Sequence, residues 1–353
     1  MKRLFTLIML LAVTLVGCGE RTTTRSSFMM DTVITYTIKS PVADKIIDEC
    51  EDMTAEFESI FSAYLDTSLV SEFNRVGMIR TIDNRYFEEV LFTAISVFHQ
   101  TNGAFDITVA PLVKAWDISH AGDDWTPLSD AEISSMLPHV GMDKLTFDLT
   151  SLARTDDNTE IDLGGIAKGY ALGAVAEYIK DNYSSAVGTV SFGGNIALIG
   201  QKDDGTPWNV GIRDPFSADS VIGTLSLDGG IVSVSGGYER YAEYNSVRYH
   251  HIINPETGSP AETDLASVAV WVDTTEPFSD ASNAGAYADA LSTALFIMGH
   301  DAALAHYEKL QRGELSRGYV NDMTFEAVLI GTDGTITLTS GLEGRFTAYE
   351  KNE

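Results

Sequence analysis

The chain has 353 residues, of which 44% are hydrophobic and 21% are charged, proportions typical of a soluble globular protein. Its 51 acidic residues against 23 basic ones give a formal net charge of −28, which disfavours binding to nucleic acid or to anionic lipid head groups. The length suffices for one large hydrophobic core or two moderate ones.

The N-terminus has the features of an export signal. Lys2 and Arg3 precede an uncharged apolar run that ends at Val16, and Gly17-Cys18 follow. The run is too short for a comfortable transmembrane span and has the order of regions of a secretory signal. A small residue directly before a cysteine resembles the bacterial lipobox, in which the cysteine is acylated. We therefore expect Cys18 to be lipidated; an ordinary cleaved signal with an incidental cysteine is the alternative.

Cleavage before Cys18 would divide the chain into a signal of residues 1–17, a lipid tether of residues 18–28 and a domain of residues 29–350. The tether is expected because residues 20–27 are polar and show no pattern. Loss of the signal removes two bases and no acid, so 21 bases against 51 acids leave a net charge of −30. The lipid would hold the chain at an extracytoplasmic face of a bacterial membrane, either the periplasmic face of the inner membrane or the cell surface.

The N-terminal half predicts one strand and two long helices. Residues 31–38 (DTVITYTI) are rich in β-branched residues and indicate a strand. A helix follows, because apolar residues recur at alternating spacings of four and three and so line one helix face. That stripe consists of Ile46, Cys50, Met53, Phe57, Ile60 and Tyr64. A second helix is expected over residues 86–100, before Asn102-Gly103.

Beyond residue 187 the pattern changes to short strands broken by glycines. The segments VGTVSFGGNIALIG, WNVGIR, IGTLSL, GIVSVSGG and RYHHIINP predict a meandering antiparallel sheet. Helices over 286–298 and 301–311 and strands over 325–330 and 336–339 complete the chain. Strand-rich and helix-rich blocks are segregated, which favours an α+β fold, a single large domain in which one half is rich in antiparallel sheet.

Residues 161–170 (IDLGGIAKGY) carry the most informative pattern. A short strand, two glycines and the start of an alanine-rich helix, which reaches about Lys180, would expose backbone N–H groups that favour an anion. Lys168 in the first helical turn would add positive charge. The segment predicts a phosphate site, although it has neither the GxxxxGK[ST] nor the GxGxxG spacing. A purely structural helix start is the alternative.

Asp289 and Thr293 lie four residues apart in a predicted helix, so their oxygens share one face. A carboxylate and a hydroxyl are hard ligands suited to Mg²⁺, which completes its octahedron with phosphate and water. Mn²⁺ accepts the same oxygen ligands. The alternative is that Asp289 caps the helix and Thr293 bonds back to it.

His250 and His251 end a predicted strand just before a Pro-x-x-Gly turn. Alternation along the strand sends the two rings to opposite faces, so only one can enter a given site. The sequence offers no HExxH, no CxxC and no third nearby histidine to support zinc. A general base or a phosphate contact is therefore the favoured role.

Residues 101–113 (TNGAFDITVAPLV) bring a loop glycine, an aromatic ring and an acid together. Two interpretations stand for this segment. It lines a planar ligand, or it closes a helix–strand junction.

The identity and order of these segments resemble the ApbE family, the FAD:protein FMN transferases. The resemblance extends from about residue 30 to residue 330. It rests on the strings MMDTVITYTI, FSAY, FN at 73–74, GAFDITVAPLVKAW, IDLGGIAKGYA, SFGGNIALIG, WNVGIRDP, SVSGGYERY, HHIINPETGSP and ADALSTALFIMG. The combination is more specific than any single string, and it implies an ApbE-like fold.

Members of this family bind FAD with Mg²⁺, cleave its pyrophosphate and attach the FMN half to a Thr or Ser hydroxyl of a target flavoprotein, releasing AMP. The resemblance therefore implies a Mg²⁺-dependent transferase whose substrate is FAD. Its partner would carry the acceptor motif D-x-x-[ST]-G-A-[ST] and is expected to be a membrane electron-transfer subunit. This chain has no such motif, so another protein must supply the acceptor.

The resemblance also implies roles for individual residues. FAD would be contacted by Met30, Tyr64, Ala104, Phe105, Asp106, Asp162, Lys168 and Ile252, of which Asp162 and Lys168 lie near its ribose and phosphates. The metal would be held by Asp289, Thr293 and the backbone carbonyl of Gly165, with Ala167 in reserve. His251 matches the family's functional histidine and is expected to take the proton of the acceptor hydroxyl, with Asp289 as the second catalytic residue.

Two positions depart from the commoner family wording. Asp31 stands where Gly is usual, and Gly164-Gly165 stands where other small residues also occur; neither removes a side chain that the chemistry needs. Competing functions are Mg²⁺-dependent hydrolysis of FAD to FMN and AMP, a non-catalytic FAD-binding lipoprotein and a generic solute-binding lipoprotein. The intact metal and histidine motifs disfavour the non-catalytic FAD carrier.

Overall fold

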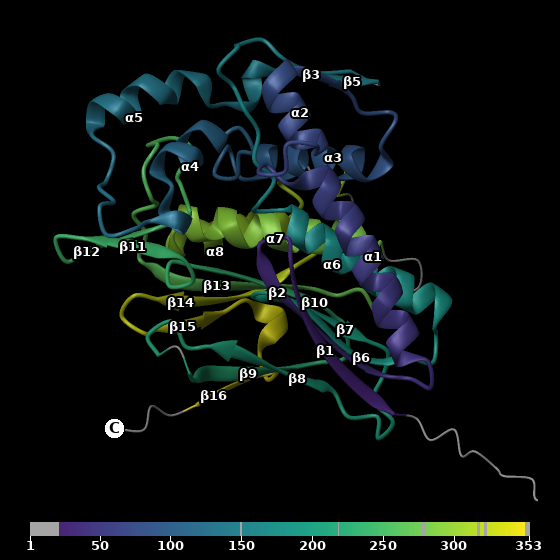
Figure 1. The fold of residues 1–353 in the computed structure, drawn as a ribbon. Coiled ribbons are helices and arrows are strands. Elements are labelled where there is room, and N and C mark those ends of the chain that lie inside the picture. Colours follow the sequence, from purple (N-terminus) through teal and green to yellow (C-terminus); the bar gives the residue numbers. More distant parts are fainter. Residues whose placement is uncertain are drawn as a thin grey trace, which may run out of the picture.

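The computed structural model describes residues 21–148, 150–217, 219–276, 280–315, 318–320 and 323–349. An eight-stranded antiparallel sheet forms its centre, with helices on one face and a smaller sheet on part of the other (Figure 1). In spatial order the strands are β1 (Thr22–Met29), β2 (Thr32–Lys39), β6 (Val187–Phe192), β7 (Asn195–Ile199), β10 (Gly230–Gly236), β13 (Leu265–Val272), β14 (Glu326–Gly331) and β15 (Ile336–Leu338).

Helices cover one face of the large sheet and enclose the main hydrophobic core with it. The longer ones are α1 (Ala43–Phe61), α3 (Arg85–Gln100), α6 (Ala167–Asn182), α7 (Ala281–Met298) and α8 (His300–Gln311). The shorter ones are α2 (Leu69–Val76), α4 (Ala110–Trp116) and α5 (Asp130–Met136). Helices α6 and α7 pack unusually closely, because a Cβ at Gly169 would lie only 2.1 Å from the carbonyl oxygen of Gly285.

Smaller elements complete the fold. A three-stranded sheet of β8 (Trp208–Arg213), β9 (Val221–Leu227) and β16 (Phe346–Ala348) packs on the second face of the large sheet. A second small sheet contains β3 (Met78–Arg80), β5 (Ser151–Arg154) and β4 (Leu145–Phe147), and a ribbon contains β11 (Tyr241–Tyr244) and β12 (Val247–His250). Single 3₁₀ turns span Ile118–His120, Leu137–His139, Met142–Lys144 and Ser340–Leu342.

The structure corrects the expectation of one continuous meander. WNVGIR and IGTLSL form β8 and β9 outside the large sheet, and the strand expected in RYHHIINP belongs to the separate ribbon. Alternating apolar residues of β8 and β9, such as Ile212 and Leu225, pack against Val232 and Trp271 of the large sheet. The two sheets therefore bury each other's faces, which a strand pattern alone does not distinguish from side-by-side pairing.

The structure also corrects the extent of the tether. Thr22–Met29 forms β1, which pairs with β2 over its whole length, so only the residues before Thr22 are available as a linker. The serines and threonines of this segment looked unpatterned, but they alternate between more and less exposed positions on an edge strand. The predicted signal and Cys18 lie outside the described residues. Among the residues described, no helix is long and apolar enough to span a membrane.

Candidate active site

A cleft of about 840 Å³ lies where the β1–β2 turn, the β6–β7 turn and the end of β10 meet the start of α6 and the middle of α7. This volume is at the upper end of the range for small-molecule sites. The residues predicted to contact FAD and metal or to act in catalysis all line the cleft: Met30, Tyr64, Ala104, Phe105, Asp106, Asp162, Gly165, Ala167, Lys168, His251, Ile252, Asp289 and Thr293.

Asp289 is buried at the middle of α7, with 5% of its surface exposed. Its Oδ1 accepts hydrogen bonds from Asn195 Nδ2 at 3.0 Å and Ser233 Oγ at 3.2 Å, and its Oδ2 accepts one from the Gly169 N–H at 2.8 Å. The carboxylate thus joins α7, α6 and the large sheet. Each oxygen has two lone pairs, so Oδ2 still has a lone pair for a ligand.

Neutral oxygens surround this carboxylate. Thr293 follows one turn later, with its Oγ1 3.2 Å from Ser235 Oγ, and a Cβ built at Gly165 would lie 3.7 Å from the same Oγ1. No group of three or more His, Cys, Asp or Glu side chains among the described residues is arranged to hold a metal. One carboxylate with hydroxyl and carbonyl oxygens fits Mg²⁺, which takes its remaining ligands from water and phosphate.

The loop before α6 has no strand of its own, contrary to the sequence prediction. The backbone N–H and carbonyl of Ile161 bond to the side-chain amide of Asn74, at 2.8 and 2.9 Å, instead of to a neighbouring strand. Turns through Gly164 and Gly165 then lead into α6, which begins at Ala167 as expected. Glu160 forms only an isolated parallel bridge with Val109, and the Asp162 N–H donates to the Ile107 carbonyl at 2.7 Å, so single backbone contacts and one side chain replace a continuous strand partner.

Asp162 and Lys168 both bond to Gly164. Asp162 Oδ1 accepts from the Gly164 N–H at 2.6 Å, and Lys168 Nζ donates to the Gly164 carbonyl at 2.5 Å. Both side chains line the cleft, so the loop presents one carboxylate and one ammonium group to a ligand. Because Asp289 already binds the Gly169 N–H, one of the N–H groups expected to favour an anion is occupied.

His251 enters the cleft, whereas His250 does not line it. His251 Nδ1 lies 3.1 Å from the Arg240 carbonyl, which can only accept, so Nδ1 carries the proton and Nε2 has a free lone pair. Burial lowers the pKa of His251 to about 4, so the ring is neutral at pH 7. His250 instead places Nε2 3.0 Å from the Ala261 carbonyl, as alternation along the strand predicts.

Asp106 is buried at another wall of the cleft. Its Oδ1 accepts from the Thr108 N–H at 2.8 Å and from Thr108 Oγ1 at 2.6 Å. Burial raises the pKa of Asp106, although the bonds from Thr108 oppose the rise. Thr108 Oγ1 in turn accepts from the Gly141 N–H at 2.6 Å, which connects this loop to the following segment.

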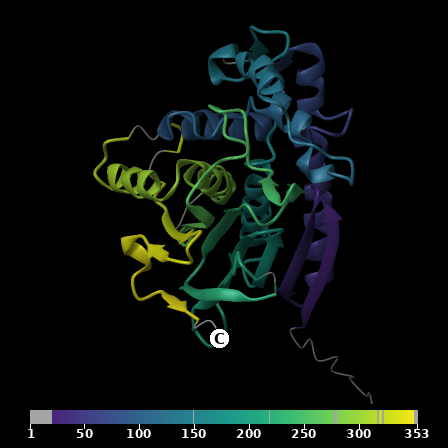
Figure 2. The same cartoon turned by 90° about the vertical axis from the view of Figure 1, so that its left-hand side faces the viewer.

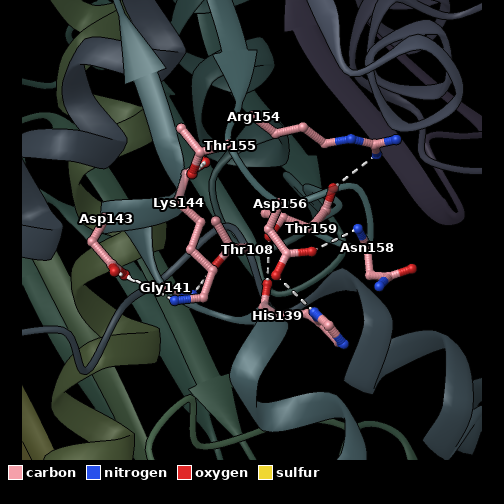
Figure 3. A network of polar contacts seen from close by, with 10 residues as sticks. All are labelled: Thr108, His139, Gly141, Asp143, Lys144, Arg154, Thr155, Asp156, Asn158 and Thr159. Carbon is pink, nitrogen blue, oxygen red and sulfur yellow. Dashed lines mark hydrogen bonds and ion pairs between the residues drawn. The ribbon is translucent and has the colours of Figure 1, made fainter.

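A polar network connects that segment with residues 154–159 (Figure 3). His139 Nδ1 lies 2.8 Å from Asp156 Oδ2, a bond that lowers the pKa of Asp156, and Thr159 Oγ1 donates to the His139 carbonyl at 2.8 Å. Arg154 Nη1 donates to the carbonyls of Thr159 and Asn74, both at 2.9 Å. Asn74 also holds the residue before Asp162, so the network supports both sides of the site.

The turn between β1 and β2 is held from two sides. Met30 and Asp31 have φ values of 51° and 57°, the left-handed conformation of a two-residue hairpin turn. The Met30 N–H donates to Glu58 Oε1 at 2.9 Å, and Arg240 donates to Asp31 Oδ2 and to the Asp31 carbonyl, each at 2.5 Å. Aspartate tolerates this conformation better than most residues, so the departure from glycine keeps the turn and adds an ion pair.

Tyr64 lies at the mouth of the cleft and outside the helical stripe to which the sequence pattern assigned it. Helix α1 ends at Phe61, three residues earlier, and 60% of the Tyr64 surface is exposed. Its ring packs edge-on against His120, with centroids 6.1 Å apart. The position agrees with the flavin-flanking role that the resemblance implies, which stays a prediction.

Sequence reasoning gave no role to several charged residues of the cleft, namely Glu58, Arg213, Glu239 and Arg240. Burial raises the pKa of Glu239, while Lys168, Arg213 and Arg240 act in the opposite direction. Arg213 ends β8, and Glu239 and Arg240 follow the glycines that end β10. Arg213 is the last residue of β8 and Arg240 directly precedes β11, so a charge at a strand end was the available signal for these two.

Comparison with known proteins supports the family resemblance found in the sequence. A model of the ApbE family matches residues 30–315, which include every cleft residue predicted from the sequence. The chain belongs to the ApbE family. The large antiparallel sheet with helices on one face is therefore an ApbE fold, and the α+β expectation is confirmed.

Individual ApbE relatives agree over most of their length. The chain is 30% identical to a FAD:protein FMN transferase of Haemophilus influenzae, over 85% of this chain and 88% of that protein. It is 31% identical to a FAD:protein FMN transferase of Vibrio cholerae, over 76% and 75% of the two chains. Among solved structures, the ApbE protein of Thermotoga maritima has a TM-score of 0.78 at 28% identity, covering 92% of this chain and 99% of that one. The flavin transferase ApbE of Vibrio cholerae has a TM-score of 0.75 at 25% identity, covering 93% and 100%.

Proposed function

We propose that this ApbE-family chain is a Mg²⁺-dependent FAD:protein FMN transferase, which attaches FMN through a phosphoester bond to a Thr or Ser of a target flavoprotein. The named relatives are FAD:protein FMN transferases, which supports transfer as the reaction type. One observation carries the mechanism. A neutral histidine with a free Nε2, the Asp289–Thr293 oxygen pair and the cations Lys168 and Arg213 line one cleft.

The reaction forms one bond and breaks another at the phosphorus of the FMN half. The acceptor hydroxyl oxygen bonds to this phosphorus, while the bond from phosphorus to the bridging oxygen breaks and AMP leaves with the electron pair. His251 Nε2 takes the hydroxyl proton, and the Arg240 carbonyl on Nδ1 holds the ring in the required tautomer. A positioned base of this kind contributes roughly 10²–10⁴-fold in rate.

The remaining polar groups of the cleft offset the negative charge of the FAD pyrophosphate. Asp289, Thr293 and the carbonyl of Gly165 would hold Mg²⁺, or Mn²⁺ in its place. The bound ion would supply neutralisation of the charge that develops on the pyrophosphate. Lys168 and Arg213 add positive charge to the same cleft, and catalysis of this type is mainly positioning and electrostatics.

Hydrolysis of FAD to FMN and AMP is the second candidate, because water can take the place of the acceptor hydroxyl in the same site. A non-catalytic FAD carrier would have no use for a histidine held in one tautomer in the same cleft as a metal-suited pair of oxygens. The acceptor is proposed to be another protein with the motif D-x-x-[ST]-G-A-[ST], such as a membrane electron-transfer subunit.

Mass spectrometry of an acceptor protein separates the two candidates. The chain is incubated with FAD, Mg²⁺ and a folded flavoprotein domain that carries the motif, and the molecular mass of the domain is then measured. Transfer predicts a covalent FMN adduct that disappears when the acceptor Thr or Ser is replaced by Val or Ala. Free FMN without any adduct would identify a hydrolase.

We also propose that the chain is exported and lipidated on Cys18, on the grounds of its N-terminal sequence. Because β1 begins at Thr22, three residues separate Cys18 from the sheet, and the four Cα–Cα steps between Cys18 and Thr22 reach at most roughly 14 Å. The domain would then sit close to the membrane surface. Labelling with a fatty-acid analogue tests this proposal. The label should enter the chain and be absent from Cys18→Ser, and equal labelling of both would refute it.

A further inference from the structure

The second face of the large sheet is only partly covered. The hydrophobic cluster beneath the β8–β9–β16 sheet draws on β7, β10, β13 and β14, and it contains no residue of β1, β2 or β6. Figure 2 shows β1 and β2 (purple) at the border of the molecule, away from the C-terminal strands (yellow). Three adjacent strands therefore present this face without a second layer among the described residues.

Hydroxyl side chains occupy the centre of this uncovered face. The strand register sets Thr24, Thr37 and Thr189 in one row and Ser26, Thr35 and Ser191 in the next. We call these six residues the hydroxyl face. Two cross-strand contacts confirm that neighbours point the same way, because Thr24 Oγ1 lies 3.3 Å from Thr37 Oγ1, and Ser26 Oγ lies 2.9 Å from Thr35 Oγ1.

The hydroxyl face carries no charge on a strongly acidic molecule. The next row outward holds Lys39, which forms an ion pair with Asp203, and the row toward the cleft holds Phe28 and Val33. Exposed edge strands usually have charged side chains that prevent association, yet the outward positions of β1 are Thr22, Thr24, Ser26 and Phe28. With a net charge of −28 on the chain, this face is where an uncharged partner surface can bind without burying a charged side chain.

The hydroxyl face is also continuous with the cleft. Thr35 and Ser191 belong to both, and the neighbouring Phe28 and Val33, which are 70% and 56% exposed, also line the cleft. A protein bound on this face would therefore extend directly over the cleft mouth. An acceptor must deliver a hydroxyl to this mouth, so the position of the face suits an acceptor more than any other partner.

We propose that the hydroxyl face, together with Phe28 and Val33, is the docking surface for the folded acceptor protein; this inference rests on the proposed function. The partner presents an uncharged surface of hydrogen-bonding groups to the threonines and serines, which both donate and accept. It places an apolar side chain on Phe28 and Val33. Docking holds the acceptor segment over the cleft, and FAD needs none of these contacts beyond the cleft rim.

Charge insertion away from the cleft tests this surface. Thr37 and Thr24 lie on the hydroxyl face but do not line the cleft. Thr37→Lys, and Thr24→Lys on the exposed edge strand, are compared with Thr347→Lys on β16 as a matched control in an exposed strand. The two face variants should raise the KM for a folded acceptor domain about tenfold or more, because a buried unpaired charge opposes association. FAD affinity and transfer to a short peptide of the acceptor motif should match wild type.

The other possible results would each overturn the proposed docking surface. An unchanged KM for the domain in both face variants would overturn the docking surface, and so would equal losses with domain and peptide, because these indicate damage to the cleft. If sedimentation showed a wild-type dimer that Thr37→Lys dissociates, the face would be a contact between copies of this chain. Failure of the proposed function itself looks different, since the wild type would then form no adduct with either acceptor.

Discussion

His251 is a base whose strength follows from its surroundings. Burial lowers its pKa from 6.5 to about 4, so the neutral form required of a base persists well below pH 7. Transfer should depend little on this group between pH 7 and pH 5 and should fall as the pH approaches 4. His251→Ala should slow transfer by roughly 10²–10⁴-fold while changing FAD affinity much less. Rates and FAD dissociation constants measured side by side test this, and a large affinity loss at normal rate would indicate a binding role instead.

Asp289 has a structural and a chemical role, and one substitution affects both. Asp289→Asn keeps the size of the side chain and removes the negative charge proposed to hold the metal, but its NH₂ group must face either the Gly169 N–H or the donors Asn195 Nδ2 and Ser233 Oγ. We expect Mg²⁺-dependent AMP release to be lost and the melting temperature to be lower than that of wild type. Asp301→Asn, an exposed acid on α8, is the control for loss of one charge. AMP release at the wild-type rate in Asp289→Asn would refute the metal assignment.

At the scale of elements, β1 determines how much of the N-terminus the fold needs. A variant beginning at Arg21 keeps all of β1 and should retain full activity in solution. One beginning at Ser26 loses half the strand and the ion pairs of Arg25 with Asp48 and Glu51, at 2.5 and 3.2 Å. We expect it to be less stable by about 2–4 kcal/mol, at roughly 1 kcal/mol for each lost backbone hydrogen bond. Denaturant unfolding measures the difference, and equal stability would show that the first half of β1 is dispensable.

The same elements show what a sequence can predict. The periodic apolar stripe gave α1 to within a few residues, because burial of one helix face sets the apolar spacing, and α3 also matched its expected bounds. Helix α7 begins at Ala281, before the predicted start at residue 286, and is buried on nearly all sides. The residues that line the cleft were predicted from sequence motifs that this chain shares with the ApbE family. The partner of a strand is set by contacts distant in sequence, so the sheet assignment of β8 and β9 was wrong. A polar edge strand buries few apolar side chains, so its sequence lacks a clear apolar pattern. For this reason β1 was interpreted as part of the tether.

At the scale of the whole molecule, buried histidines should make the fold sensitive to acid. His306 on α8 is buried, its Nε2 has no hydrogen-bond partner among the described residues, and burial lowers its pKa to about 4. The unfolded chain, with the ordinary pKa of 6.5, takes up a proton first as the pH falls, so stability is lost between pH 7 and pH 4. At pH 5 this loss is on the order of 2 kcal/mol.

Replacing this ring should reduce the acid sensitivity. The decrease in unfolding free energy from pH 7 to pH 5 should be smaller in His306→Leu than in wild type by about that amount. Denaturant unfolding at the two pH values provides the comparison. An unchanged pH dependence in His306→Leu would contradict a buried neutral histidine.

Transfer and hydrolysis differ in where the FMN half of FAD ends, although both release AMP. The most direct measurement counts AMP, free FMN and covalent FMN in a single reaction with FAD, Mg²⁺ and an acceptor domain. The proposed transferase predicts one AMP for each covalent FMN, with little free FMN while unmodified acceptor remains. AMP matched by free FMN, with no FMN on the acceptor, would contradict it.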